Sequence, residues 1–223
     1  MKDHSFPIAI EGLPFIFFFL AAALLLLYFS RFGKDYSIFF STFGWFLLFL
    51  ALFSISFFRN PERLIPDDLN AVVSPSDGTV VAVEKVNNDR YLKKEALKIS
   101  IFMSVFNVHV NRAPVSGKVE KILYNKGKFI SANLDKASFD NEQNGVVVEA
   151  KSGEKVAFVQ IAGLIARRIV CYLKEGDEVI KGERIGLIRF GSRLDVYLPL
   201  TSKINVKVGG KVKAGESVIA YME

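Results

Sequence analysis

Two long uncharged runs near the N-terminus constrain this chain more than any other feature. Leu13 to Phe29 and Tyr36 to Phe58 contain no Asp, Glu, Lys or Arg and are 17 and 23 residues long. A helix needs about 20 apolar residues to cross the hydrocarbon core of a bilayer. The second run is therefore long enough to span a membrane, and the first reaches that length only if the flanking Gly12 is included.

The first run has two interpretations, the core of a signal peptide or the first helix of a membrane hairpin. Its flank carries Asp3 and Glu11 beside a single basic residue, Lys2, and no small-residue cleavage site follows Phe29. A second apolar run comes immediately, after a connection of only five residues, 31–35. These features favour the hairpin, in which both ends of the pair lie on the same side of the membrane.

Basic residues around the two runs favour cytoplasmic ends. The connection contributes two basic side chains, whereas the opposite flanks contribute three, Lys2, Arg59 and Arg63. The positive-inside rule then places the ends of the hairpin in the cytoplasm by a margin of one charge. The single cysteine, Cys171, is compatible with this, because one cysteine cannot form an internal disulfide. We predict the inner cell membrane, with the later part of the chain facing the cytoplasm.

The chain changes character after residue 58. Of its 29 basic and 23 acidic side chains, three of each lie in residues 1–58, so the whole excess of +6 lies in residues 59–223. We therefore predict a membrane-anchoring hairpin over 1–58 and one domain with its own core over 59–223. Such a basic domain suits an anionic membrane surface. Nucleic acid is not an expected partner, because the basic residues are scattered rather than gathered into a patch.

The later domain is predicted to be mainly β. It contains short runs rich in β-branched or aromatic residues, bounded by Gly, Asn, Asp or Lys clusters, and no helical periodicity of useful length. The runs are 80–83, 97–102, 145–149, 155–159 and 185–188.

An internal repeat refines the predicted fold. The pattern G-x-x-V-x-x-G-E occurs over Gly176–Glu183 and again 33 residues later over Gly209–Glu216. Two such hairpin-like units predict a compact pseudo-symmetric β barrel or sandwich, similar to the hammerhead barrel of lipoyl and biotinyl domains. Those carriers present a modifiable lysine at a hairpin turn, whereas the corresponding turn here holds Gly191 and Ser192.

The pair Gly191-Ser192 follows the apolar run 184–188. A Gly-Ser pair is ordinary turn material. A serine placed directly after a glycine on a tight turn could, however, attack the carbonyl of its own preceding peptide bond, and glycine leaves that carbonyl uncrowded. Ser192 is therefore a candidate nucleophile and Gly191 a candidate site of chain cleavage.

Two further residues could assist Ser192. His109 is the single histidine after the apolar runs. A strand histidine is commonly structural, yet His109 is also the one candidate base near neutral pH. Asp77, in a Pro-Ser-Asp-Gly turn, could orient His109 in an Asp-His-Ser set. One histidine cannot supply a histidine-rich zinc site, so no metal is predicted.

Five motifs in this order resemble those of the short bacterial branch of the phosphatidylserine decarboxylase proenzymes. They are Phe57-Phe-Arg-Asn-Pro-Glu-Arg63, Ser74-Pro-Ser-Asp-Gly78, Asn107-Val-His-Val-Asn-Arg-Ala-Pro114, Gln160-Ile-Ala-Gly-Leu-Ile-Ala-Arg-Arg-Ile169 and Phe190-Gly-Ser-Arg193. The resemblance covers nearly everything after Phe57. Many relatives outside this branch have Leu-Gly-Ser-Thr at the last motif, so Arg193 is a departure from them.

The resemblance implies a self-cleaving decarboxylase. Ser192 would add to the Gly191 carbonyl, with His109 as base and Asp77 behind it, and would become a covalent pyruvoyl group. The products would be a β chain of residues 1–191 and an α chain of residues 192–223, which form a heterodimer. The pyruvoyl group would form a Schiff base with the amine of phosphatidylserine, carbon dioxide would leave, and His109 would return a proton to give phosphatidylethanolamine.

Arginines near the motifs are the candidates for binding the substrate headgroup. Four arginines near the motifs could bind the phosphodiester or could instead be surface or inter-strand residues: Arg112, Arg167, Arg168 and Arg193. The polar stretch Phe129 to Asn144 is expected to be a long loop that meets the bilayer. The alternative function is a membrane-anchored, lipoyl-like adaptor or binding module, which would remain an intact polypeptide.

Overall fold

The computed structural model of this chain describes residues 6–32, 35–87, 90–127, 141–163, 168–189 and 191–222. These residues form two compact units, Met1–Glu62 and Arg63–Glu223. The first unit is helical and the second is built from β strands.

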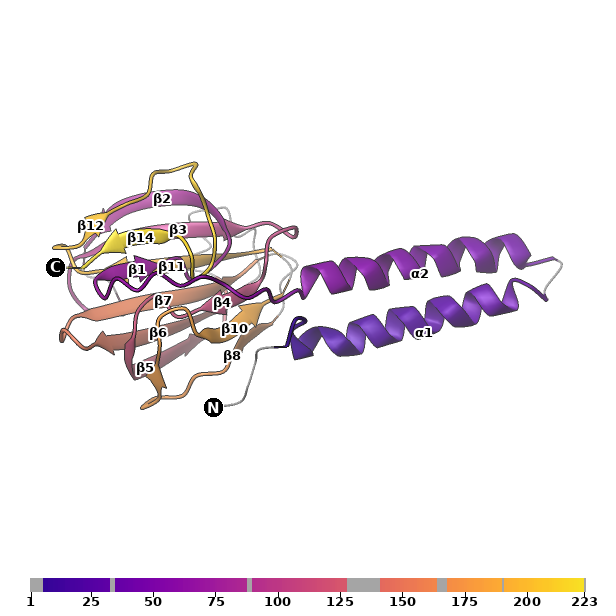
Figure 1. Cartoon of the computed structure of the whole chain (residues 1–223), viewed down its shortest axis with the longest axis horizontal. Helices are drawn as coiled ribbons and strands as arrows, with labels where there is room; N and C mark the ends of the chain where they lie inside the picture. Colours follow the sequence, from indigo (N-terminus) through magenta and orange to yellow (C-terminus); the bar gives the residue numbers. More distant parts are fainter. Residues whose placement is uncertain are drawn as a thin grey trace. The chain divides into compact units, whose positions relative to one another are not determined.

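The helical unit is the hairpin that the two apolar runs predicted. A short 3-10 turn, Ile10–Gly12, leads into α1 (Leu13–Phe29), and α2 (Ser37–Phe57) returns beside it (Figure 1). Together with the 3-10 turn, α1 provides a candidate span of 20 residues, and α2 provides one of 21. The helices are therefore long and apolar enough to cross a membrane, as judged from length and composition.

Small residues allow the two helices to pack closely. Ala23 in α1 and Ala51 in α2 are buried, and a Cβ added to Gly44 would lie 2.8 Å from the Leu27 side chain. Close approach through small residues is the usual packing of helices in lipid. At the open end of the hairpin, the Ala9 N–H donates to the Phe58 carbonyl at 2.8 Å, so the chain enters and leaves side by side.

An eight-stranded antiparallel sheet, curled into a half-barrel, forms the larger part of the β unit (Figure 1). Its strand order is β13-β2-β3-β11-β7-β6-β5-β9. The strands are β2 (Gly78–Val86), β3 (Ala96–Met103), β5 (Gly117–Asn125), β6 (Gln143–Ala150), β7 (Lys155–Ala162), β9 (Glu178–Val179), β11 (Ser192–Leu198) and β13 (Lys211–Val212).

Two three-stranded sheets complete this unit, in the orders β1-β14-β12 and β4-β10-β8. Their strands are β1 (Ala71–Val73), β4 (Val110–Arg112), β8 (Ile169–Cys171), β10 (Arg184–Ile188), β12 (Lys203–Ile204) and β14 (Val218–Tyr221). All five predicted strands lie within β2, β3, β6, β7 and β10, which confirms the mainly β prediction. The larger of two clusters of buried apolar side chains, which includes Ile99, Phe158 and Leu194, joins strands of all three sheets and provides a rigid support.

The repeat noticed in the sequence occupies the two edges of the large sheet. β9 belongs to the first copy and β13 to the second, and they are the outermost strands. Four glycines at matching positions have positive φ angles: Gly176 (+92°), Gly182 (+82°), Gly209 (+86°) and Gly215 (+75°). Such angles are easily adopted only by glycine. Because the copies lie at opposite edges, β11 and β7 become the central pair of the sheet.

Two parts of this unit differ from the sequence-based prediction. Ser192, expected on a tight turn, is the first residue of β11, a strand that was not predicted because Arg193 and Asp195 interrupt its apolar residues. The predicted loop from Phe129 to Asn144 ends earlier than expected, since β6 begins at Gln143. Residues 129–140 of that loop lie outside the described residues.

Candidate active site

Ser192 lies at the start of the central strand. It is fully buried and is paired with Met103 of β3 on one side and Ala162 of β7 on the other. Gly191, directly before it, has a φ of +66°, and an added Cβ would meet nothing within 4 Å. The need for glycine is therefore conformational rather than a matter of space. The Gly191–Ser192 bond thus joins a left-handed residue to a strand held on both sides.

The sulfur of Met103 connects Ser192 to the segment that carries the histidine. The Ser192 Oγ lies 4.0 Å from Met103 Sδ, and the Asn111 Nδ2 lies 3.7 Å from the same sulfur. Asn111 is buried in β4, and His109, two residues before it, is also buried. The structure thereby brings Ser192 and the strand that follows His109 together through Met103, and the contact between His109 and Ser192 stays a prediction.

A main-chain carbonyl orients His109. The His109 Nδ1 lies 2.9 Å from the carbonyl oxygen of Asn107. Asn107 is fixed by a turn, because its Oδ1 accepts from the Ser104 N–H and the Ser104 hydroxyl, both at 2.9 Å. A carbonyl can only accept a hydrogen bond, so Nδ1 carries the proton in the neutral ring and Nε2 is the basic nitrogen.

Asp77 has partners that the sequence did not indicate. Its carboxylate accepts two hydrogen bonds from Arg63 Nη2, at 2.9 and 3.0 Å, and one from the Ala214 N–H at 2.8 Å. Arg63 also lies 3.6 Å from Glu216. The Asn107 carbonyl makes the contact to Nδ1 of His109, and the orienting role of Asp77 stays a prediction. Arg63 was missed because nothing in its spacing pairs it with Asp77.

Asp77 and His109 nevertheless lie on neighbouring antiparallel segments. Two backbone hydrogen bonds join these segments, from Val73 to Pro114 (3.0 Å) and from Arg112 to Pro75 (2.9 Å). Asp77 follows the first of these segments by two residues, and the partner of its carboxylate there is Arg63.

A chain of buried amide side chains was also missed. The Gln160 Nε2 donates to the Asn111 Oδ1 at 2.9 Å, and the Asn144 Nδ2 donates to the Gln160 Oε1 at 3.2 Å. These residues come from β7, β4 and β6, and none is more than 5% exposed. Because only the strand register brings them together, no spacing in the sequence indicated the chain.

The candidate headgroup arginines differ in position. Arg193 is 1% exposed and binds Asp195 Oδ1 through Nε at 2.6 Å and the Ser100 hydroxyl through Nη2 at 2.8 Å. Arg112 is also buried and donates to the Gly182 carbonyl at 2.7 Å. Both guanidinium groups thus have partners inside the β unit, and phosphodiester binding by Arg112 and Arg193 stays a prediction. Arg168 is exposed before β8, and Arg167 lies outside the described residues.

We expect Arg193→Met to lower the free energy of unfolding by about 3–5 kcal/mol, because it leaves the buried Asp195 carboxylate without its cation. Urea unfolding in detergent measures this, with Ser192→Ala present in every protein compared so that each stays a single chain. The double variant Arg193→Met/Asp195→Leu removes both charges and should recover most of the loss. A double variant as unstable as the single one would contradict a structural role for the pair.

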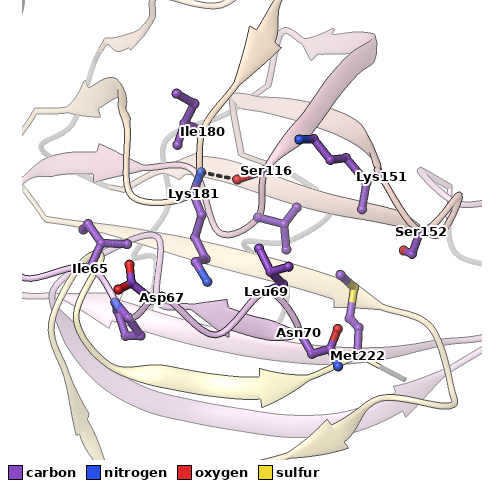
Figure 2. A pocket seen from close by; sticks show the side chains of 13 residues that line it. Ile65, Asp67, Leu69, Asn70, Ser116, Lys151, Ser152, Ile180, Lys181 and Met222 are labelled. Atoms are coloured by element: carbon purple, nitrogen blue, oxygen red, sulfur yellow. Dashed lines mark hydrogen bonds between the residues drawn. The ribbon is translucent and has the colours of Figure 1, made fainter.

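A separate pocket lies away from Ser192. It has a volume of about 620 Å³ and is lined by residues that include Ala150, Ser116 and Lys181 (Figure 2). Burial lowers the pKa of Lys181, and the nearby carboxylates of Asp68 and Asp67 oppose this effect. Ala150 ends β6, whereas Ser192 lies at the level where β6 begins. At about 3.3 Å per residue the two places are roughly 20 Å apart, so this pocket is not part of the candidate active site.

Comparison with known proteins identifies the class. A sequence model of the family described as phosphatidylserine decarboxylase matches residues 50–220. Proteins named phosphatidylserine decarboxylase proenzyme from Desulfotalea psychrophila, Citrifermentans bemidjiense and Geobacter sulfurreducens are 51%, 52% and 49% identical to this chain over 222 residues. Each match covers 100% of both chains. The chain belongs to the phosphatidylserine decarboxylase family, as the five motifs indicated.

Proposed function

We propose that this chain cuts itself between Gly191 and Ser192 and then decarboxylates phosphatidylserine to phosphatidylethanolamine and carbon dioxide. The observation that carries the proposal is the buried Ser192, placed after a left-handed glycine and next to the segment of His109. Membership of the family and full-length matches to proteins named as proenzymes support it.

In the cutting reaction, His109 Nε2 takes the proton of the Ser192 hydroxyl. The Ser192 Oγ adds to the Gly191 carbonyl carbon, and the carbon–nitrogen bond breaks, which leaves an ester at Oγ and a free amine on residue 192. Loss of the Ser192 α-proton then expels the Gly191 carboxylate. Water then replaces the amino nitrogen of residue 192, which leaves as ammonia. Residue 192 becomes the N-terminus of the new chain and carries two adjacent carbonyl groups.

The residues around Ser192 fit the pyruvoyl group that this sequence of steps produces. Residue 192 is buried, and β11 is hydrogen-bonded on both sides, so the new chain end stays in place after the cut. The pyruvoyl group supplies an electron sink for the bonding pair that departing carbon dioxide leaves behind. His109 then returns a proton to the substrate carbon.

Charged residues support these proton transfers and the binding of the headgroup. Asp77, on the segment beside His109, stabilises the imidazolium that forms when His109 holds a proton. Arg63 keeps the Asp77 carboxylate in position. Arg168, with its exposed side chain, and the adjacent Arg167 are the arginines that we propose for the phosphodiester.

We place the protein in the inner cell membrane. The helices α1 and α2 cross the bilayer, and both ends of the hairpin and the β unit face the cytoplasm, where the basic β unit meets anionic lipid. The mature protein is a heterodimer of residues 1–191 and 192–223.

Mass spectrometry of the purified protein tests the proposal. We expect a 32-residue fragment that begins with a pyruvoyl-blocked residue 192, together with release of carbon dioxide from phosphatidylserine in detergent micelles. A preparation that contains only the intact 24.9 kDa chain and releases no carbon dioxide would favour the alternative, an adaptor without self-cleavage.

A further inference from the structure

We propose that the side-chain amide of Asn111 is a catalytic hydrogen-bond donor in the cutting reaction, where it binds the oxyanion that forms on the Gly191 carbonyl oxygen. This inference rests on the proposed self-cleavage. It assigns a second functional group, besides His109, to the segment that faces Ser192.

The position of Asn111 is the first part of the argument. Its Nδ2 and the Ser192 Oγ lie on the same sulfur atom, Met103 Sδ, at 3.7 and 4.0 Å. Asn111 and Ser192 are both 0% exposed. An N–H group of Asn111 and the hydroxyl that attacks are therefore held, away from water, against the same sulfur atom.

The orientation of the Asn111 amide is the second part. Its Oδ1 accepts a hydrogen bond from Gln160 Nε2 at 2.9 Å, and Gln160 is itself held because its Oε1 accepts from Asn144 Nδ2 at 3.2 Å. Rotating the Asn111 amide by half a turn would place its NH₂ against the NH₂ of Gln160. The amide chain therefore keeps the oxygen of Asn111 toward β7 and its NH₂ group toward Met103, whose sulfur also contacts Ser192.

The acceptor that Asn111 faces is the third part. A thioether sulfur accepts hydrogen bonds weakly, and 3.7 Å is a long contact. The buried Asn111 amide therefore loses little hydrogen-bond energy when it leaves the sulfur and donates to a stronger acceptor, the oxyanion. When Ser192 Oγ adds to the Gly191 carbonyl, the carbonyl π pair becomes a full negative charge on oxygen. An amide N–H oriented in advance stabilises that charge without reorganisation of solvent.

The variant Asn111→Asp tests the inference. It keeps the oxygen that accepts from Gln160 and replaces the N–H donor with a second acceptor. In chains made by cell-free synthesis with detergent, we expect the 32-residue fragment to appear about 10²- to 10³-fold more slowly than in the wild type, the usual effect of removing one oxyanion donor. Asn60→Asp, which changes a buried asparagine of the helical unit, is the matched control and should be cut at the wild-type rate.

A second variant changes the hydrogen-bond partner of Asn111 and leaves Asn111 itself in place. Gln160→Glu replaces the donor that faces Asn111 Oδ1 with an acceptor, so the Asn111 amide turns its N–H toward residue 160 and away from Ser192. We expect cutting to slow by at least 10-fold, and this variant decides the question if Asn111→Asp does not fold.

The outcomes separate this inference from the proposed function. A wild-type chain that is never cut would overturn the proposed function itself. If the wild type is cut and a variant, Asn111→Asp or Gln160→Glu, is cut at the same rate, only the role of Asn111 is overturned. Gel filtration shows that the variant is folded. Equal slowing in Asn111→Asp and Asn60→Asp would also overturn it, because the effect would then reflect a buried carboxylate anywhere in the chain.

Discussion

Replacing Ser192 with alanine should leave the chain as a single polypeptide of 24.9 kDa with no measurable decarboxylation of phosphatidylserine. The variant lacks the hydroxyl that attacks the Gly191 carbonyl, and it also lacks the atoms from which the pyruvoyl group is made. The loss should therefore be complete rather than partial. Denaturing gel electrophoresis and carbon dioxide release measure the two effects.

Ser202→Ala provides the control for Ser192→Ala, because Ser202 is another buried serine of the same unit. We expect Ser202→Ala to be cut and active. The appearance of a 32-residue fragment from Ser192→Ala would show that another group attacks the Gly191 carbonyl, and the assignment of the nucleophile would be wrong.

The second large effect is expected for His109→Ala. This variant retains Ser192 but has no base to take its proton, so the fragment should appear about 10²- to 10⁴-fold more slowly. Added imidazole should restore part of the rate, because a small base can enter the space that the side chain leaves. A misfolded variant would not respond in this way.

The other histidine of the chain, His4, gives the matched control, and His4→Ala should be cut as the wild type is. Normal cutting of His109→Ala would contradict the role of His109 as base. It would leave Asp77 without a function in the reaction, since its proposed effect is on the imidazolium.

Much of the fold could be predicted because its signals are local. The apolar runs that became α1 and α2 need only their length and composition to be recognised. The repeat over 176–183 and 209–216 needs glycine at fixed spacing, and the positive φ angles explain that requirement. The strand β11 was missed because Arg193 and Asp195 look like surface residues in a sequence. Their mutual ion pair is what allows both to be buried.

The site residues that could be predicted are those that local sequence alone marks as candidates. Ser192 is marked by the glycine before it, and His109 is marked because it is the single histidine after the apolar runs. The contact of Arg63 with Asp77 spans 14 residues, and that of Ala214 with Asp77 spans 137, so neither follows from local pattern. The chain from Asn144 to Asn111 depends on the register of three strands.

The central position of β11 determines whether the protein can refold after it has been cut. A cut before Ser192 would leave the 32-residue piece supplying β11, β12, β13 and β14, and with them a partner for β1, β2, β3 and β7. The chain would have to fold before it is cut, since the serine is positioned only by the finished sheet. After denaturation the two pieces would have to meet by diffusion, so recovery would depend on concentration. Each molecule would therefore fold as a single chain only once, before the cut.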